Sequence, residues 1–284
     1  MIRRPPRSTQ GVSSAASDVY KRQLFPLSAA RQMYEPLDPL KFSIFAPYYE
    51  GAKQTVEYFV QEKGKKVIGI LYQDDDYGKE VRVGVADQLA EMGMTLAAET
   101  TYKRGAKDFS SQIAKLQAAG CDLVVLGTVI RETIGAVVTA RKMGWKVDML
   151  VSGAGYTPHV AFLAKGATHG LYASFQVPIP YADTASSELK AWMEKYKAKY
   201  DADANIQAAY GYRAMSLFAV AAEQAGHHID SAKLTAALES ITGYTDMFGG
   251  PALSFSSTSH VGTTQGGLAQ IDGTRWVTLI DILE

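Results

Sequence analysis

Short apolar runs alternate with amphipathic stretches along residues 65–177. The runs at 67–72 and 122–128 are apolar almost without interruption, as in strands that are buried on both faces. In stretches such as 79–92, apolar side chains recur at helical spacing, which predicts helices with one buried face. Strands are therefore expected at 67–72, 94–100, 122–128, 147–152 and 170–177, and helices at 79–92, 108–119 and 132–143. Repeated β-α-β units of this kind predict a parallel sheet with helices on both faces.

The alternation stops at residues 178–181, where Pro178 and Pro180 favour a crossover out of the sheet. The stretch 205–225 is apolar on nearly every face, so a buried helix is expected there. The Asp272-Gly273 pair lies between two apolar runs and predicts a hairpin. The elements predicted after the crossover are helices at 186–200, 205–225 and 231–241, the last capped by Asp230, and strands at 252–255 and 267–283.

This pattern predicts two sets of elements. One is a self-contained α/β unit at residues 65–181, and the other combines residues 24–64 with residues 182–259. The second set has helices but too few strands to build a sheet on which a buried helix could pack. Residues 1–23 are rich in Arg, Ser, Pro and Gln without periodic apolar positions, which predicts a disordered leader foreign to the folded protein. An authentic basic tail is the alternative interpretation of this segment.

Composition narrows the classes of function. The 29 basic and 29 acidic residues balance, so no basic face for nucleic acid is expected. Cys121 is the single cysteine, which excludes an internal disulfide and cysteine-ligated metal clusters. No apolar run approaches the ~18 residues of a membrane span, and no secretory signal is recognised.

Motifs typical of enzymes are absent from the sequence. No G-x-G-x-x-G follows the first strand, and no G-x-S-x-G is present. The histidines lack the spacing of metal ligands and an evident nucleophile partner; they are His159, His169, His227, His228 and His260. The run Asp74–Asp76 indicates a solvated turn rather than a metal site. The protein is therefore predicted not to be an enzyme and to have no catalytic residues, metal or cofactor.

Several stretches of the chain resemble the periplasmic solute-binding proteins of ABC transporters, of the branched-chain amino acid-binding (Leu/Ile/Val-binding) type. They occur in the family's order and spacing and cover residues 24–284; the stretches are 26–30, 42–47, 71–78, 107–116, 140–144, 176–180 and 211–217. The resemblance implies a type I periplasmic binding protein fold, which is an α/β fold of two Rossmann-like lobes with parallel sheets. The implied domains are lobe 2 at 65–181, the remainder of an N-terminally truncated, incomplete lobe 1 at 24–64 and 182–259, and strands near the hinge and lobe 2 at 260–284.

The same resemblance implies a function. A protein of this type is the substrate-binding component of an ABC transporter and captures a small organic solute in the cleft between its lobes. Its partners would be that small-molecule ligand and the membrane permease and ATPase subunits of the transporter. It would work in the periplasm, although no signal peptide is present in this chain. A ligand-binding sensor or receptor domain of the same fold is the alternative.

Ligand-binding residues are expected at the carboxyl ends of the strands, where parallel sheets bind ligands. In lobe 2 these residues are Tyr77, Thr128, Val129, Arg131, Ser152, Gly153, Tyr156 and Gln176. The resemblance adds Ser28, Ala29 and Tyr210 from lobe 1. Packing is the alternative role for Tyr77 and Tyr156. Arg131 either binds a ligand carboxylate or pairs with Glu132 at the start of a helix.

Two departures from the family pattern bear on the ligand. Amino-acid-binding members place a carboxylate for the ligand ammonium after the fourth strand, whereas residues 152–155 here contain no acid. Val129 stands where those members carry an aromatic residue. A buried ammonium group without a counter-ion is costly. An aromatic or aliphatic carboxylate, or a neutral amide, is therefore expected to fit better than a branched-chain amino acid.

Overall fold

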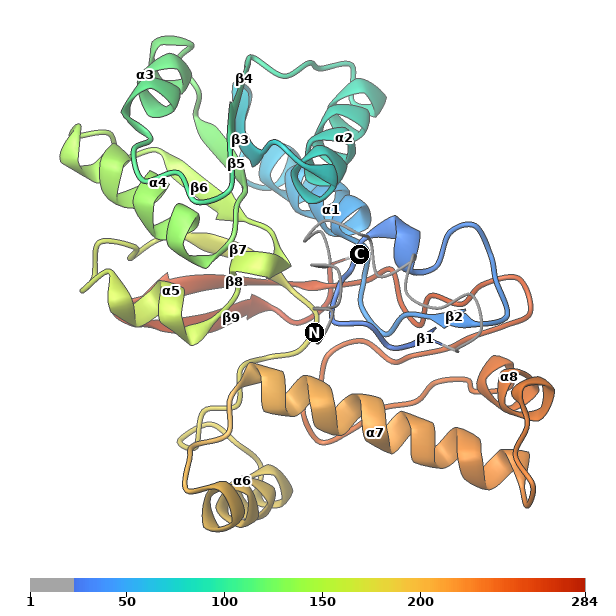
Figure 1. The fold of residues 1–284 in the computed structure, drawn as a ribbon. Helices are drawn as coiled ribbons and strands as arrows, with labels where there is room; N and C mark the ends of the chain where they lie inside the picture. Colours follow the sequence, from blue (N-terminus) through green and yellow to red (C-terminus); the bar gives the residue numbers. More distant parts are fainter. Residues whose placement is uncertain (1–22, 284) are drawn as a thin grey trace, which may run out of the picture.

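The computed structural model describes residues 23–283 of the 284-residue chain, and these residues form two lobes (Figure 1). The large lobe is built on a seven-stranded sheet with the order β4-β3-β5-β6-β7-β8-β9. Its strands are β3 (Ile68–Gln73), β4 (Ala98–Tyr102), β5 (Leu123–Gly127), β6 (Asp148–Val151), β7 (Tyr172–Phe175), β8 (Gly267–Asp272) and β9 (Arg275–Ile280). Strands β3 to β7 run parallel, whereas β8 and β9 form an antiparallel hairpin at one edge.

Helices cover both faces of this sheet. One face carries α1 (Tyr48–Gln61) and α2 (Asp76–Glu91), and the other carries α3 (Ser110–Ala118), α4 (Ile130–Lys142) and α5 (Pro158–Leu163). Side chains of β5 alternate between the two cores: Leu123 belongs to the cluster with α1 and α2, and Val124 to the cluster with α3 and α4. Both are fully buried. This two-sided burial explains why the strand is an unbroken apolar run in the sequence.

The small lobe carries helices on a minimal sheet. Its helices are α6 (Ser187–Tyr200), α7 (Ile206–Ala225) and α8 (Ser231–Glu239), and its strands β1 (Gln23–Leu24) and β2 (Lys41–Phe42) pair in parallel. Leu217 of α7 lies in a cluster with Phe42, but Met215 of the same helix is 64% exposed. Part of this helix is therefore uncovered, as the predicted shortage of strands in this set of elements implies, because strands of two residues each cannot cover it. No described helix, α7 included, is long and apolar enough to cross a membrane.

The structure differs from the sequence-based expectations at two places. Residues 252–255 form no strand, and Leu253 makes only an isolated bridge to Tyr244, in a segment that Pro251 begins. Helix α1 was expected outside the large lobe, but it packs along α2. A Cβ added to Gly84 would lie 2.5 Å from the Tyr49 carbonyl oxygen, so glycine permits this close approach. The predicted leader, residues 1–23, lies outside the described residues except for Gln23.

Three segments connect the lobes, at residues 43–47, 176–186 and 262–266. They lie against one another. Gly262 N donates to Ser43 O at 2.8 Å, and Gln176 Nε2 donates to Ala46 O at 3.3 Å. The lobes therefore meet at a compact, hydrogen-bonded hinge.

Candidate functional site

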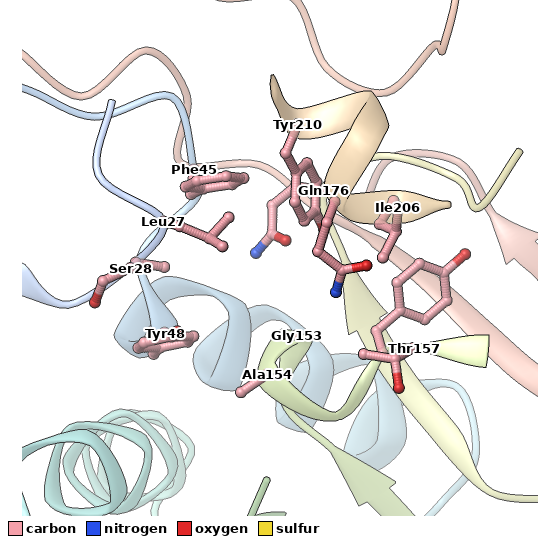
Figure 2. A pocket seen from close by; sticks show the side chains of 13 residues that line it. Leu27, Ser28, Phe45, Tyr48, Gly153, Ala154, Thr157, Gln176, Ile206 and Tyr210 are labelled. Atoms are coloured by element: carbon pink, nitrogen blue, oxygen red, sulfur yellow. The ribbon is translucent and has the colours of Figure 1, made fainter. Parts of the chain in front are cut away.

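A cavity of about 230 Å³ lies between the two lobes, beside the hinge (Figure 2). Segments far apart in the sequence form its walls. The lining residues are Leu27, Ser28, Ala29, Phe45, Tyr48, Gly153, Ala154, Tyr156, Thr157, Gln176, Ile206, Gln207 and Tyr210. A concave space where two lobes meet is a common position for a small-molecule site.

The large lobe lines the cavity with the segments that follow its strands. Strand β6 ends at Val151, and the 3₁₀ turn η3 (Gly153–Gly155) begins two residues later. A Cβ at Gly155 would lie 2.5 Å from Val151 Cγ2, so glycine allows this tight return of the chain. Tyr156 and Thr157 follow and lead into α5. This wall lies at the carboxyl ends of the strands, where parallel sheets bind their ligands.

The small lobe contributes a loop and the first turns of a long helix. Leu27, Ser28 and Ala29 lie between β1 and the 3₁₀ turn η2 (Arg31–Met33), and Phe45 follows β2. Helix α7 contributes Ile206, Gln207 and Tyr210 of its first turns. The Asn205 side chain fixes the start of that helix by accepting a hydrogen bond from Ala208 N at 3.0 Å. Helix α1, from the large lobe, adds Tyr48 of its own first turn.

The cavity wall is aromatic and uncharged. Phe45 and Tyr210 meet edge to face with ring centroids 4.8 Å apart, and Tyr156 stacks on Phe175 at 5.1 Å. Hydroxyl and amide groups supply the polar part of the wall, and among the described residues that line it there is no Asp, Glu, Lys, Arg or His. Within residues 23–283, no group of three His, Cys, Asp or Glu residues is placed to hold a metal ion. The wall therefore presents aromatic rings and neutral hydrogen-bonding groups to the cavity.

Gln176 holds a central position in this wall. Figure 2 shows its amide group pointing into the opening beside Gly153 and Ala154. A Cβ at Gly153 would lie 3.1 Å from Gln176 Nε2, and a Cβ at Gly250 would lie 2.2 Å from the Gln176 carbonyl oxygen. The two glycines thus let the backbone close around Gln176 from both lobes. The amide can offer a donor and an acceptor to a ligand at the hinge.

Two tyrosines of the wall stay protonated over the physiological range. Burial raises the pKa of Tyr156 and of Tyr210 far above the ordinary value. The Tyr156 hydroxyl accepts a hydrogen bond from Ile179 N at 3.2 Å, which fixes its ring against the crossover. These rings therefore present neutral faces rather than charges to the cavity.

The structure brings six of the eleven predicted site residues to this cavity. They are Ser28, Ala29, Gly153, Tyr156, Gln176 and Tyr210. The other five, Tyr77, Thr128, Val129, Arg131 and Ser152, do not line it. Val129 occupies the N-cap position of α4 without a side-chain hydrogen bond, and Arg131 is exposed in the first turn of that helix. No ion pair joins Arg131 to Glu132 in the described part of the chain, where the Glu132 carboxylate instead accepts from Gly105 N at 3.1 Å.

Tyr77, Thr128 and Ser152 form a hydrogen-bonded layer behind the wall. The Tyr77 hydroxyl lies 2.6 Å from Ser152 Oγ and donates to Thr128 O at 3.0 Å. The Tyr77 ring packs edge to face on Tyr48 of the cavity wall at 4.9 Å. The layer therefore ties the ends of β5 and β6 to the first turn of α1.

Replacing Tyr77 with phenylalanine should lower the free energy of unfolding by about 1–2 kcal/mol. The substitution keeps the ring but leaves buried polar atoms of Thr128 and Ser152 without their partner. Urea denaturation followed by circular dichroism measures the change. Tyr49→Phe is the matched control, because the Tyr49 hydroxyl bonds Asp87 at the surface and its loss should cost less than ~0.5 kcal/mol. Equal effects at the two positions would contradict the proposed layer.

Sequence reasoning missed the remaining residues of the cavity wall. These are Leu27, Phe45, Tyr48, Ala154, Thr157, Ile206 and Gln207. Ala154 and Thr157 belong to the predicted loop after β6, so the strand-end rule could have found them. The residues at the starts of α1 and α7 carry no such local signal. Their place in the wall depends on how the lobes face each other.

Comparison with protein families places the chain among known proteins. A profile described as periplasmic binding protein matches residues 8–275. The chain is 28% identical over 192 residues to a leucine-, isoleucine-, valine-, threonine- and alanine-binding protein of Pseudomonas aeruginosa, covering 65% of this chain and 48% of that protein. It is 26% identical to a Leu/Ile/Val-binding protein homologue of Brucella abortus over 47% of this chain and 34% of that one. The chain thus spans about half, or less, of these relatives' length.

Solved structures show the same arrangement of elements. A branched-chain amino acid ABC transporter protein from Thermus thermophilus with bound valine superposes with a TM-score of 0.80 and 17% identity, over 91% of this chain and 71% of that one. A substrate-binding periplasmic protein from Ralstonia solanacearum gives 0.77 and 24%, over 90% and 72%. A fatty acid ABC transporter substrate-binding protein from Thermomonospora curvata gives 0.75 and 21%, over 87% and 65%. These likenesses concern the fold.

Proposed function

The chain belongs to the periplasmic binding protein family, and from this membership we propose that it is the substrate-binding component of an ABC transporter. The type I fold and the likeness to the branched-chain amino acid-binding type, both predicted from the sequence, are confirmed. In the proposed role the chain captures a small organic solute between its lobes in the periplasm. It then delivers the solute to a membrane permease with ATPase subunits.

The main support for this proposal is the interlobe cavity. It lies where two lobes on a compact hinge can close over a molecule, and both lobes contribute residues to its wall. We assign the ligand contacts to five of the lining residues, Ser28, Gly153, Tyr156, Gln176 and Tyr210. Capture rather than catalysis fits a wall of neutral side chains with no acid, base or nucleophile pair among them.

The uncharged wall restricts the class of solute. A ligand ammonium buried there would lack a counter-ion, which costs several kcal/mol. The first turns of α1 and α7 line the cavity, and the positive ends of helix dipoles favour an electronegative group. We therefore propose a ligand with an aromatic or aliphatic body and a carboxylate or neutral amide, rather than an α-amino acid.

A matched set of probes with one carbon skeleton separates these ligand classes. Phenylacetate, phenylacetamide, phenethylamine and L-phenylalanine share a ring and short chain but differ in charge. Titration calorimetry, with leucine included, should show binding of the acid or the amide and none of the two ammonium-bearing aromatic probes. Tight binding of leucine or L-phenylalanine, with no binding of the acid and amide, would reject the proposed ligand class. Binding of either kind in the cavity would still support solute capture.

Filling the cavity should abolish capture. Ala154 lines the cavity, and phenylalanine at this position would occupy the space between the lobes. Ala154→Phe is expected to weaken binding of any solute found by calorimetry at least tenfold, while the urea midpoint changes little. The matched control is Ala90→Phe, since Ala90 is exposed on α2 away from the cavity. Unchanged affinity in Ala154→Phe would place the binding site elsewhere.

A further inference from the structure

Glu80 connects the two lobes beside the cavity. It lies on α2 of the large lobe and is 7% exposed. Both of its carboxyl oxygens accept from Arg31 N, Oε1 at 3.0 Å and Oε2 at 3.2 Å. Arg31 begins η2 of the small lobe, two residues after Ala29 of the cavity wall. This contact therefore joins the two lobes through residues outside the three connecting segments.

The surroundings of Glu80 oppose its negative charge. The Arg31 Nε lies 3.8 Å from Oε1 and is the cation of the cluster. Glu35 on the small lobe adds a like charge. The neutral rings of Tyr34 and Tyr48 also face Glu80, and Glu50 of α1 interacts with Tyr34. Burial is the largest effect and outweighs the Arg31 contacts, so the pKa of Glu80 rises from 4.5 to about 7.

We propose that Glu80 is an interlobe latch that engages with uptake of a proton, so that acidification favours the closed arrangement of the lobes. The Arg31 amide needs only an acceptor, and a protonated carboxyl group still offers its carbonyl oxygen. The proposal concerns closure itself. Its consequence for solute capture rests on the proposed function.

The direction of the pH effect follows from where the proton binds. When the lobes part, water reaches Glu80 and its pKa returns toward the ordinary 4.5. Between about pH 4.5 and 7 the closed arrangement then binds a proton that the open one releases. The stabilisation is fully present below pH 4.5 and is lost as the pH rises toward 7. The ratio of closed to open protein should fall up to about tenfold per pH unit across this window.

Hydrogen exchange at the Arg31 amide tests the latch without any ligand. NMR of the full chain reports the protection factor of this amide, corrected for the intrinsic pH dependence of exchange, together with the titration of the Glu80 carboxyl carbon. We expect protection to fall about ten- to a hundredfold between pH 5 and 8, with Glu80 titrating near pH 7. A Glu80 titration near 4.5, or protection that does not change with pH, would overturn the proposal.

Two variants test whether Glu80 is the group that causes the pH dependence of Arg31 protection. Glu80→Gln keeps an acceptor for the Arg31 amide but cannot ionise, so its protection should stay near the acid limit at every pH. Glu35→Gln removes an exposed like charge that makes only a minor contribution to the raised pKa of Glu80, so protection should still fall with rising pH, with a midpoint that is at most slightly lower. A persistent pH response in Glu80→Gln would contradict the proposal; if that variant fails to fold, the titration of the wild-type carboxyl still decides.

Binding measurements at two pH values distinguish a failure of the latch proposal from a failure of the proposed function. Calorimetry with phenylacetate at pH 5.5 and 8 should show tighter binding at the lower pH in the wild type and no such difference in Glu80→Gln. If Arg31 protection follows Glu80 while none of the matched probes binds, the latch stands and the ligand assignment fails. If a probe binds with the same affinity at both pH values, the latch does not govern capture and its proposed consequence is wrong.

Discussion

Replacing Gly78 with alanine is expected to lower the free energy of unfolding by about 3 kcal/mol or more. A Cβ at this position would lie 2.0 Å from the Gln73 carbonyl oxygen and 2.7 Å from the Gln73 nitrogen. Both atoms belong to the backbone of β3, which cannot swing away as a flexible side chain can. The Asp75 side chain also accepts from Gly78 N at 3.1 Å, so the clash falls on the turn that starts α2.

Urea denaturation of Gly78→Ala measures this loss, and Gly211→Ala provides the matched control. Gly211 is exposed on α7 with nothing within 4 Å of an added Cβ. Alanine is about 1 kcal/mol more favourable than glycine inside a helix, so this variant should be as stable as the wild type or more stable. If Gly78→Ala unfolds at the same urea concentration as the wild type, the prediction is wrong and the turn between β3 and α2 can widen to accept a Cβ.

The second large effect is expected at Asp246. Its carboxylate and the Arg213 guanidinium form a buried pair, with side chains 4% and 3% exposed and 3.1 Å between Oδ2 and Nε. Arg213 also donates to Pro251 O at 2.9 Å and to Gly249 O at 3.3 Å. Burial raises the pKa of Asp246 and lowers that of Arg213, since each charge is costly in this position. Asp246→Ala should therefore cost about 3–5 kcal/mol, because Arg213 remains buried without its counter-ion.

A double variant distinguishes the pair from simple loss of packing. Arg213→Met combined with Asp246→Leu removes both charges and should recover much of the stability lost in Asp246→Ala. Asp183→Ala is the control, because its pair with Arg275 is largely exposed and should be worth less than ~1 kcal/mol. Thermal and urea unfolding of the variants give the comparison. A double variant no more stable than Asp246→Ala would contradict the prediction that the loss in Asp246→Ala comes from the unpaired charge of Arg213.

The architecture of the large lobe could be predicted because its signals are local. Strand β5 is buried on both faces and therefore appears as an unbroken apolar run. Asp75, Ser186 and Asp230 each accept from a backbone amide at the start of a helix, close to the starts expected from the sequence. Gly273 has a positive φ in the predicted hairpin. Each feature is determined within a few residues, which is why the pattern reveals it.

The lobe boundary and part of the cavity wall depend on contacts between distant segments. Helix α1 packs on α2 through Gly84, and nothing near residue 48 in the sequence indicates that partner. Tyr77 follows a strand as a ligand-contacting residue should, yet its hydroxyl is taken by Thr128 and Ser152. Ile206 and Gln207 reach the cavity only because α7 starts opposite η3. The position of a residue within one lobe therefore does not predict which residues of the other lobe it will face.

The three connecting segments have a mechanical consequence for capture. Gly262 is hydrogen-bonded to Ser43, and Gln176 is hydrogen-bonded to Ala46. The three segments should therefore move together, as one broad strap. Twisting one lobe against the other, or sliding it sideways, would shear these bonds, whereas bending across the strap leaves them intact. The lobes should therefore open and close by rotation about a single axis, and the same pairs of atoms should come into contact at each closure.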